Sequence, residues 1–214
     1  MINILMQAIT QDSLELEITS VCTLECPGCS RVNTKHLKSE WDKGHLDFEI
    51  IENVIKTTNF KWYNIIGCYG DAIYHPRFWD IIQLLNNEDK NYMLHTNGSS
   101  RSQRWWDTAL DIKGWHRGHK FCFAIDGLED TNHYYRINAK WDTILTGLNT
   151  MSKVTERPQV IWRMLDFPYN RHQQKDAEAL AQSYGMKFEI HPTFRSTDQY
   201  KHDNPRLFQQ KNIP

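Results

Sequence analysis

The chain has 214 residues, 40% of them apolar and 24% charged, which is the composition of one globular domain. Its eight Trp, nine Tyr and nine Phe residues exclude disorder as the main state, because so many rings have to be buried. With 25 Lys and Arg against 26 Asp and Glu, the net charge of −1 gives no overall attraction to nucleic acid or to an anionic membrane. No apolar run approaches the roughly 20 residues of a bilayer span, and the N-terminus has no signal-peptide pattern, so we expect a cytoplasmic protein.

Strands and helices are predicted to alternate along the chain. Short apolar or alternating runs predict strands, and a 3.6-residue apolar periodicity predicts helices between them. The strands are expected at residues 14–20, 61–68, 91–96, 119–125, 159–165 and 186–191. The helices are expected at residues 48–58, 76–87, 102–112, 140–153 and 171–185. Asp47 is a plausible cap of the first helix, Pro76 suits the first turn of the second, and Gly185 stops the last.

This regular βα alternation indicates an α/β fold with a parallel sheet and right-handed crossovers. Six units are too few for a closed eight-stranded barrel, so an open, partial barrel or a doubly wound sheet is expected. The sequence shows no internal repeat and no low-complexity linker. We therefore expect one domain over residues 1–192, followed by a polar tail over residues 193–214 that is packed on the domain or frayed.

Every predicted strand runs into a polar or glycine-containing turn. After the second to sixth strands these turns include residues 67–71, 96–98, 126–127, 163–166 and 191–192. Because active sites of such folds lie at the carboxyl ends of the strands, these turns are candidates for one shared site. Turn chemistry alone explains Gly, Asn and Asp in any single loop. It does not explain the loop after the first strand.

Three of the five cysteines, Cys22, Cys26 and Cys29, form a C-x3-C-x2-C array in that loop. Thiols this close in a cytosolic chain usually bind metal. A helix would place them on one face, but Pro27 inside it would cost about 3 kcal/mol, so we expect a loop. His36 could complete a closed zinc site. Alternatively, three cysteines could hold an iron–sulfur cubane with one iron left open, and the spacing favours this second reading.

Four segments together resemble one enzyme family, the radical S-adenosylmethionine (SAM) superfamily. Its cluster-binding loop is similar to LEITSVCTLECPGCSR, its Gly-Gly-Glu-Pro segment to YGDAIYHP, its Thr-Asn-Gly turn to LHTNG, and its Ser-Val/Ile-Asp-Gly segment to FAIDGLEDTNHYYR. The resemblance covers roughly residues 14–192. The branch it resembles most contains peptide- and protein-modifying enzymes and molybdopterin-precursor cyclases. It implies a partial (βα)6 barrel, a parallel sheet with the helices outside.

The resemblance also implies a cofactor chemistry. Cys22, Cys26 and Cys29 would hold one [4Fe–4S] cluster, and the amino and carboxylate groups of SAM would chelate its fourth iron. An electron from a flavodoxin- or ferredoxin-type donor would cleave SAM to methionine and a 5′-deoxyadenosyl radical, which would abstract a hydrogen atom from the substrate. Relatives of this branch often carry a cysteine-rich C-terminal extension for further clusters. No cysteine follows Cys122, so one cluster is expected.

Individual SAM contacts follow from the matched segments. Gly70 would let the backbone approach the methionyl group, and Asp71 would accept a hydrogen bond from its ammonium. Thr96 and Asn97, in the Thr-Asn-Gly turn, would also belong to the cofactor site. Asp126 would lie at the ribose hydroxyls.

Arg163 could face the carboxylate of SAM, or it could form a surface pair with Asp166. The chain also departs from the family pattern at several positions. Gly28 stands where an aromatic residue is usual, Asp71 replaces Glu, Ala72 replaces Pro, and Ala124 stands where many relatives have Ser.

Several other features have less specific interpretations. Cys68 and Cys122 are expected to be packed thiols, although Cys68, beside the SAM segment, could donate a hydrogen atom to a product radical. The segment 101–120 carries five Lys or Arg and three Trp, which could bind nucleic acid, but Trp residues packed inside a helix face are the preferred reading. The substrate is open; a broad barrel top suits a peptide or protein slightly better than a small molecule.

Overall fold

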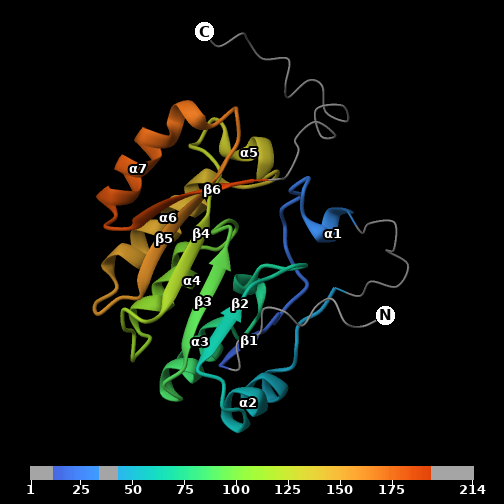
Figure 1. Ribbon diagram of the computed structural model, residues 1–214. Coiled ribbons are helices and arrows are strands. Elements are labelled where there is room, and N and C mark those ends of the chain that lie inside the picture. The colour runs from blue at the N-terminus through green and yellow to red at the C-terminus, as the bar shows by residue number, and fades with distance from the viewer. Residues whose placement is uncertain (1–11, 34–42, 194–214) are drawn as a thin grey trace.

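The computed structural model describes residues 12–33 and 43–193, and Figure 1 shows their arrangement. The elements in chain order are β1 (Ser13–Glu15), α1 (Ser30–Asn33), α2 (Phe48–Thr57), β2 (Trp62–Ile65), η2 (Ala72–Tyr74), α3 (Phe78–Asn87), β3 (Asn91–Thr96), α4 (Gln103–Asp107), η3 (Thr108–Leu110), β4 (Lys120–Ala124), α5 (Asn132–Tyr135), α6 (Trp141–Lys153), β5 (Gln159–Asp166), η4 (Arg171–Gln173), α7 (Gln174–Ser183) and β6 (Lys187–Pro192).

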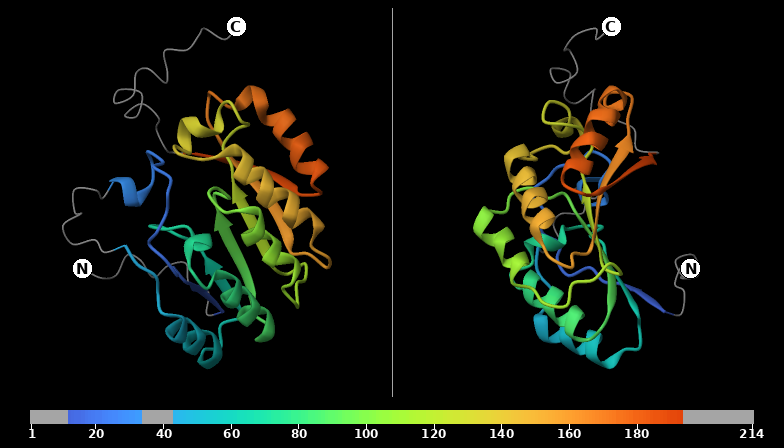
Figure 2. Two further views of the ribbon diagram at one scale, coloured as in Figure 1. Left: turned by 180° about the vertical axis from the view of Figure 1, so that it is seen from behind. Right: turned by 90° about the vertical axis from the view of Figure 1, so that its left-hand side faces the viewer.

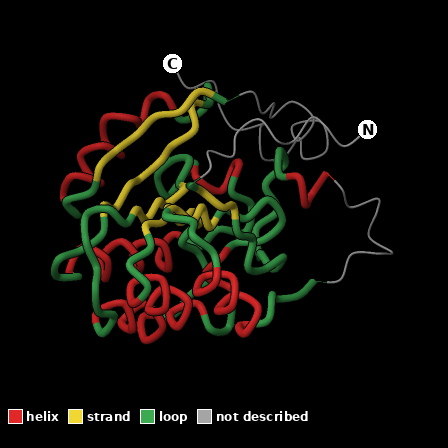
Figure 3. The backbone as a smooth tube through the Cα atoms, turned by 60° about the horizontal axis from the view of Figure 1, so that its bottom comes forward, coloured by secondary structure: helices red, strands yellow, loops and turns green. Residues whose placement is uncertain are grey.

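The six strands form one parallel sheet in the order β1-β2-β3-β4-β5-β6. Each strand pairs only with its neighbours in the chain, so the sheet has no switch point and is not doubly wound. The sheet curves without closing, and α2, α3, α4, α6 and α7 lie along its outer face (Figures 2 and 3). The predicted α/β fold with a parallel, open (βα)6 sheet is confirmed.

The core lies between the sheet and these helices. Tyr92 and Leu94 of β3 are fully buried, whereas His95 between Leu94 and Thr96 is only partly covered, as expected for residues that alternate between the two faces. Trp106 is fully buried against Phe121 and Phe123, at ring distances of 6.1 and 5.7 Å. The prediction that Trp residues of segment 101–120 pack on the inner face of its helix is thus confirmed at Trp106; Trp115 is also buried, at 5% exposed, but it lies in the loop after η3.

The first strand is shorter than predicted. It ends at Glu15, although Leu16 N–H still donates to the carbonyl of Asn64 in β2, and residues 18–20 run beside residues 44–46 instead. There Leu46 donates its backbone N–H to the carbonyl of Ile18 at 2.9 Å, and Thr19 forms an antiparallel bridge with His45. The alternation of apolar and polar residues in this segment therefore reflects an extended backbone whose residues 18–20 pair with residues 44–46 and not with β2.

Several helix boundaries also differ from the prediction. The helix expected from Pro76 begins two residues later, at Phe78, after a 3-10 turn over residues 72–74. Asp47 does occupy the N-cap position of α2, but its side chain makes no capping hydrogen bond. The short helices α1 and α5 carry no periodicity that could have predicted them, because each has only four residues. No helix in residues 12–33 and 43–193 is long and apolar enough to cross a bilayer.

Candidate functional site

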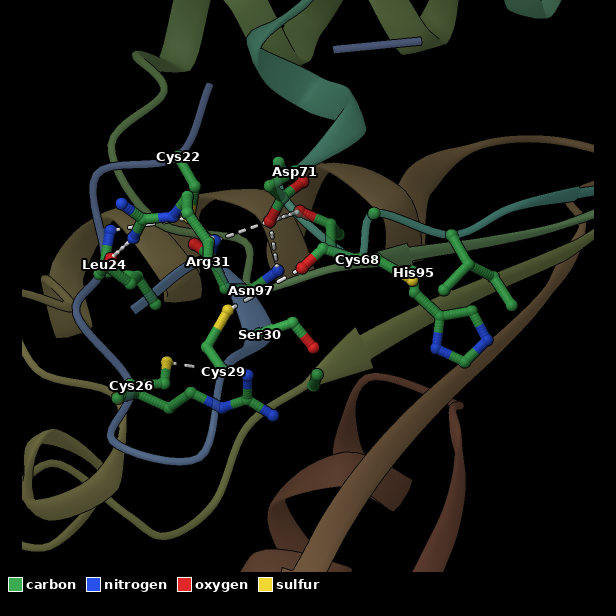
Figure 4. Close-up of a pocket in the computed structure, with 16 residues that line it drawn as sticks. Cys22, Leu24, Cys26, Cys29, Ser30, Arg31, Cys68, Asp71, His95 and Asn97 are labelled. Carbon is green, nitrogen blue, oxygen red and sulfur yellow. Dashed lines mark hydrogen bonds between the residues drawn. The ribbon is translucent and has the colours of Figure 1, made fainter. Parts of the chain in front are cut away.

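A cavity of about 280 Å³ lies at the carboxyl ends of the strands, where the cysteine loop meets the turns after β2 and β3 (Figure 4). Its walls combine sulfur, carboxylate, amide and guanidinium groups. The lining residues are Cys22, Leu24, Cys26, Cys29, Ser30, Arg31, Ile66, Gly67, Cys68, Gly70, Asp71, His95, Thr96, Asn97, Ala124 and Arg136. All three predicted metal ligands line this cavity, together with five other predicted site residues: Cys68, Gly70, Asp71, Thr96 and Asn97. Asp126 does not line it but pairs with Arg136, which does, and Arg163 lines the adjoining cavity.

The cysteine array lies on a loop, as predicted from Pro27. Backbone hydrogen bonds tie the loop to its surroundings, from Glu25 N–H to the carbonyl of Ile137 at 3.1 Å and from Asp71 N–H to that of Val21 at 2.9 Å. The buried residues Leu24, Cys26, Tyr135 and Phe167 form an apolar cluster separate from the main core. This cluster packs the loop against α5 and the loop after β5 and buries Leu24 and Cys26, whereas Thr23 and Glu25 remain exposed.

Two of the three cysteine sulfurs, those of Cys22 and Cys26, face N–H donors, whereas the Cys29 thiol donates to the carbonyl of Cys68 at 3.9 Å. Cys22 Sγ accepts from Leu24 N at 3.4 Å and from Asn97 Nδ2 at 3.7 Å, and Cys26 Sγ accepts from Arg136 Nη1 at 3.9 Å. Burial raises the pKa of the Cys22 thiol to about 12 and also raises the pKa of the Cys26 thiol. Such thiols stay protonated until a bound metal displaces the proton. Soft sulfur ligands with donors aimed at them fit an iron–sulfur cluster.

A single-ion site is not formed by the described part of the chain. No three Cys, His, Asp or Glu side chains within residues 12–33 and 43–193 are grouped so that they could hold one metal ion. His36, the fourth ligand of the alternative zinc site, lies outside the described residues.

Asp71 is almost fully buried and hydrogen-bonded to the turn after β3. Its Oδ2 accepts from Thr96 Oγ1 at 3.0 Å, from Asn97 N at 2.7 Å and from Asn97 Nδ2 at 2.5 Å, and its Oδ1 accepts from Ile73 N at 3.3 Å. Figure 4 shows the side chains of Asp71 and Asn97 pointing toward each other. Burial raises the pKa of Asp71, and these donors work against that rise. The carboxylate therefore joins the two turns, which no local sequence signal revealed.

Gly70 is required by backbone packing. A Cβ at this position would lie 2.0 Å from the carbonyl oxygen of Thr19, far inside contact distance. Glu17, which the sequence analysis did not single out, holds the same turn: its Oε1 accepts from Tyr69 N at 2.6 Å and from Gly70 N at 3.0 Å. A substitution at Gly70 therefore disturbs the turn itself, whatever the turn binds.

Asp126 is fully buried and forms an ion pair that sequence analysis missed. Its Oδ2 accepts from Arg136 Nε at 2.6 Å, and its Oδ1 accepts from Leu165 N at 2.7 Å. Asn170 Nδ2 donates to the Asp126 carbonyl at 2.8 Å, so this one residue joins β4, α5 and the loop after β5. Arg136 is the last residue of the resembling segment 123–136, which was the one signal that could have drawn attention to it.

Arg163 pairs with Glu189, its neighbour across β5 and β6, at 3.0 Å. The alternative pair with Asp166 is wrong, because Asp166 follows three residues later at the strand end and binds Arg171 at 2.9 Å. A second cavity of about 430 Å³ adjoins the first, sharing His95, Ala124 and Arg136 with it and adding Arg163, Leu165, Pro192 and Thr193. Burial and the nearby Arg163 lower the pKa of His95 to about 4, so its ring is neutral at pH 7.

The two isolated cysteines differ from each other. Cys122 is fully buried, as expected for a packed thiol, whereas Cys68 is exposed and lines the cysteine cavity. The prediction of packing is therefore wrong for Cys68. The β2 strand ends at Ile65, so Cys68 lies in the open turn beyond it.

Glu189→Gln is expected to lower the free energy of unfolding by about 1 kcal/mol at pH 7, and the difference should vanish in acid. Hydrogen bonds and charges from Lys187 and Arg163 lower the pKa of Glu189 to about 2 against the opposing effect of burial. A carboxyl whose pKa is lowered by folding stabilises the fold above its unfolded pKa, near 4.5, and this contribution disappears as the pH falls to about 2. Urea unfolding at pH 7, 4 and 2.5 would measure it. Glu52→Gln, which breaks the exposed pair with Lys56, is the control, and an equal pH dependence in both variants would contradict the prediction.

No protein-family model and no curated protein sequence matches this chain. Several solved structures nevertheless share its fold. SuiB from Streptococcus suis, bound to S-adenosylmethionine, superposes with a TM-score of 0.65 at 11% identity over 92% of this chain and 46% of SuiB. TYW1 with a lysine-pyruvate adduct bound gives 0.59 at 11% identity over 94% of this chain and 74% of that one. Methylornithine synthase (PylB) gives 0.58 at 11% identity over 84% and 52%.

These likenesses define the fold class. The chain is an α/β protein with an open, parallel six-stranded sheet, its fold is similar to those of SuiB, PylB and TYW1, and its cysteine cavity lies at the carboxyl ends of the strands. It spans about half the length of the SuiB chain that it matches.

Proposed function

We propose that this chain is a radical SAM enzyme that holds one [4Fe–4S] cluster on Cys22, Cys26 and Cys29 and binds SAM beside it. The observation that carries the proposal is the position of the C-x3-C-x2-C loop, which borders a cavity at the carboxyl ends of a sheet like that of SAM-bound SuiB. When bound, cluster and SAM would supply reductive cleavage of SAM and a 5′-deoxyadenosyl radical that abstracts hydrogen from the substrate.

The chain's own residues would bind and orient these groups and exclude water. Leu24, Tyr135 and Phe167 cover the cysteine loop with apolar side chains. Arg163 lines the second cavity and is our candidate partner for the SAM carboxylate, with Glu189 fixing its orientation. The Oδ2 atom of Asp71 already accepts three hydrogen bonds, so the SAM ammonium would approach its Oδ1.

The remaining assignments are proposals of the same kind. Thr96 and Asn97 would shape the cofactor cavity through their bonds to Asp71, and Asp126 would serve the ribose end. Cys68 is exposed at the cavity, where a hydrogen-donating thiol would have to lie. We propose a peptide or protein substrate, a flavodoxin- or ferredoxin-type electron donor, and a cytoplasmic setting in which thiols remain reduced.

Anaerobic reconstitution with iron and sulfide tests this function. We expect a brown protein with about four iron and four sulfide per chain, whose reduced electron paramagnetic resonance (EPR) signal changes when SAM is added. The competing zinc module, with Cys22, Cys26, Cys29 and His36 as ligands, predicts a colourless protein that retains one zinc and ignores SAM. A protein that binds neither iron and sulfide nor SAM would contradict the proposal.

A further inference from the structure

Two buried carboxylates at the carboxyl ends of the sheet each hold an N–H donor against a cysteine sulfur. Asp71 follows β2 and Asp126 follows β4; they are 5% and 0% exposed. Neither touches a sulfur directly. Each acts through one intermediate side chain, and the two arrangements reach different cysteines of the array.

The first arrangement runs from Asp71 through Asn97 to Cys22. The amide nitrogen Nδ2 of Asn97 donates to Asp71 Oδ2 at 2.5 Å and to Cys22 Sγ at 3.7 Å. The carbonyl oxygen of the same amide accepts from Ser99 N at 2.8 Å, so the orientation of the amide is determined on both sides. This donor is neutral.

The second arrangement runs from Asp126 through Arg136 to Cys26. Arg136 donates its Nε to Asp126 Oδ2 at 2.6 Å and its Nη1 to Cys26 Sγ at 3.9 Å. The guanidinium side chain is only 14% exposed, and Cys26 itself is buried. This donor carries a positive charge into a poorly solvated site, where Coulomb interactions are much stronger than in water.

We propose that the Asp126–Arg136 pair is a positioning pair that sets the reduction potential of the cluster through the sulfur of Cys26, an inference that rests on the proposed function. A cluster gains one negative charge on reduction, so a nearby cation and an N–H donor favour the reduced state and raise its potential. Asp126 has two effects in this pair: it orients the guanidinium group of Arg136, and it partly offsets the positive charge of that group. The neutral Asn97 donor at Cys22 acts in the same direction with a smaller effect.

Removal of the positive charge and removal of the negative charge should shift the reduction potential in opposite directions. This distinguishes an electrostatic effect on the cluster from a purely structural role of the pair. Arg136→Gln removes the cation and keeps a donor, so we expect a more negative potential than in the wild type. Asp126→Asn removes the opposing charge and keeps the shape, so we expect a more positive potential. Arg136→Lys keeps the charge but lacks the forked geometry, so we expect a value between those of the wild type and Arg136→Gln.

The experiment is an EPR-monitored redox titration of each reconstituted variant without SAM, with iron and sulfide content and circular dichroism measured on the same samples. Arg171→Gln is the matched control, because it also breaks an Asp–Arg pair, the exposed one with Asp166. It is expected to leave the potential unchanged.

Unshifted potentials in both Arg136→Gln and Asp126→Asn, or shifts in the same direction, would overturn the proposal. If Arg136→Gln does not fold or does not hold a cluster, the other two variants test the proposal. The potential should then be more positive than in the wild type for Asp126→Asn and more negative for Arg136→Lys. Loss of the cluster in all three variants would show that the pair only builds the site, which also overturns it. A wild-type chain without iron and sulfide would instead refute the proposed function.

Discussion

Replacement of Cys22, Cys26 and Cys29 together by alanine is expected to abolish iron and sulfide binding while the sheet stays folded. The three side chains belong to the small apolar cluster around Phe167 or pack beside it, apart from the main core between sheet and helices. Cys22 and Cys29 are only partly buried and Cys26 is buried in the small cluster, and truncation of each thiol should cost about 1 kcal/mol. Iron analysis after reconstitution measures the first effect, and thermal unfolding of the apo-proteins measures the second.

Single variants at the other two cysteines are the controls for this prediction. Cys68→Ala and Cys122→Ala are expected to bind as much iron as the wild type, because neither lies in the array. Zinc fingers unfold when their metal is removed. Comparable unfolding of the triple variant would contradict the prediction and favour a structural metal. Iron retained in the triple variant would contradict the ligand assignment itself.

Asp71→Ala is expected to lower the free energy of unfolding by about 3 kcal/mol, because several buried donors lose their acceptor at once. Asn97 and Thr96 would then be released from the turn after β2. Urea denaturation of the apo-protein measures this loss. Asp71→Asn keeps the shape and one acceptor oxygen, so its loss should be smaller. Equal stability of wild type and Asp71→Ala would contradict the structural role.

The same variant bears on the cofactor. In reconstituted protein, Asp71→Ala is expected to weaken SAM binding roughly ten- to hundredfold, or about 1.5–3 kcal/mol. The cluster should remain, since Asp71 is not a ligand. Gly70→Val would not report on SAM in the same way, because its side chain would first collide with the backbone of Thr19. Asp71 is therefore the informative position in this turn.

The amino-acid sequence alone determined the order and class of the elements. Apolar patterns located β2 to β6 and the five longer helical segments, since each pattern depends only on which face of one local element is buried, but they extended β1 beyond Glu15. Residue chemistry located the cysteine loop too, because Pro27 is incompatible with a helix interior whatever surrounds it. The convergence of polar turns at one end followed from the parallel sheet.

Only the tertiary structure decided which of these side chains meet. Arg136 and Cys26 are 110 residues apart, and Asp71 and Asn97 are 26 apart, so no local pattern records their contacts. Arg163 forms its ion pair with Glu189 because the register of β5 on β6 places the two residues side by side. The sequence had suggested Asp166 as the partner, which is nearer along the chain. Strand register and the packing of loops on the sheet are set by many distant contacts together, and these determine the partners of each charge in the site.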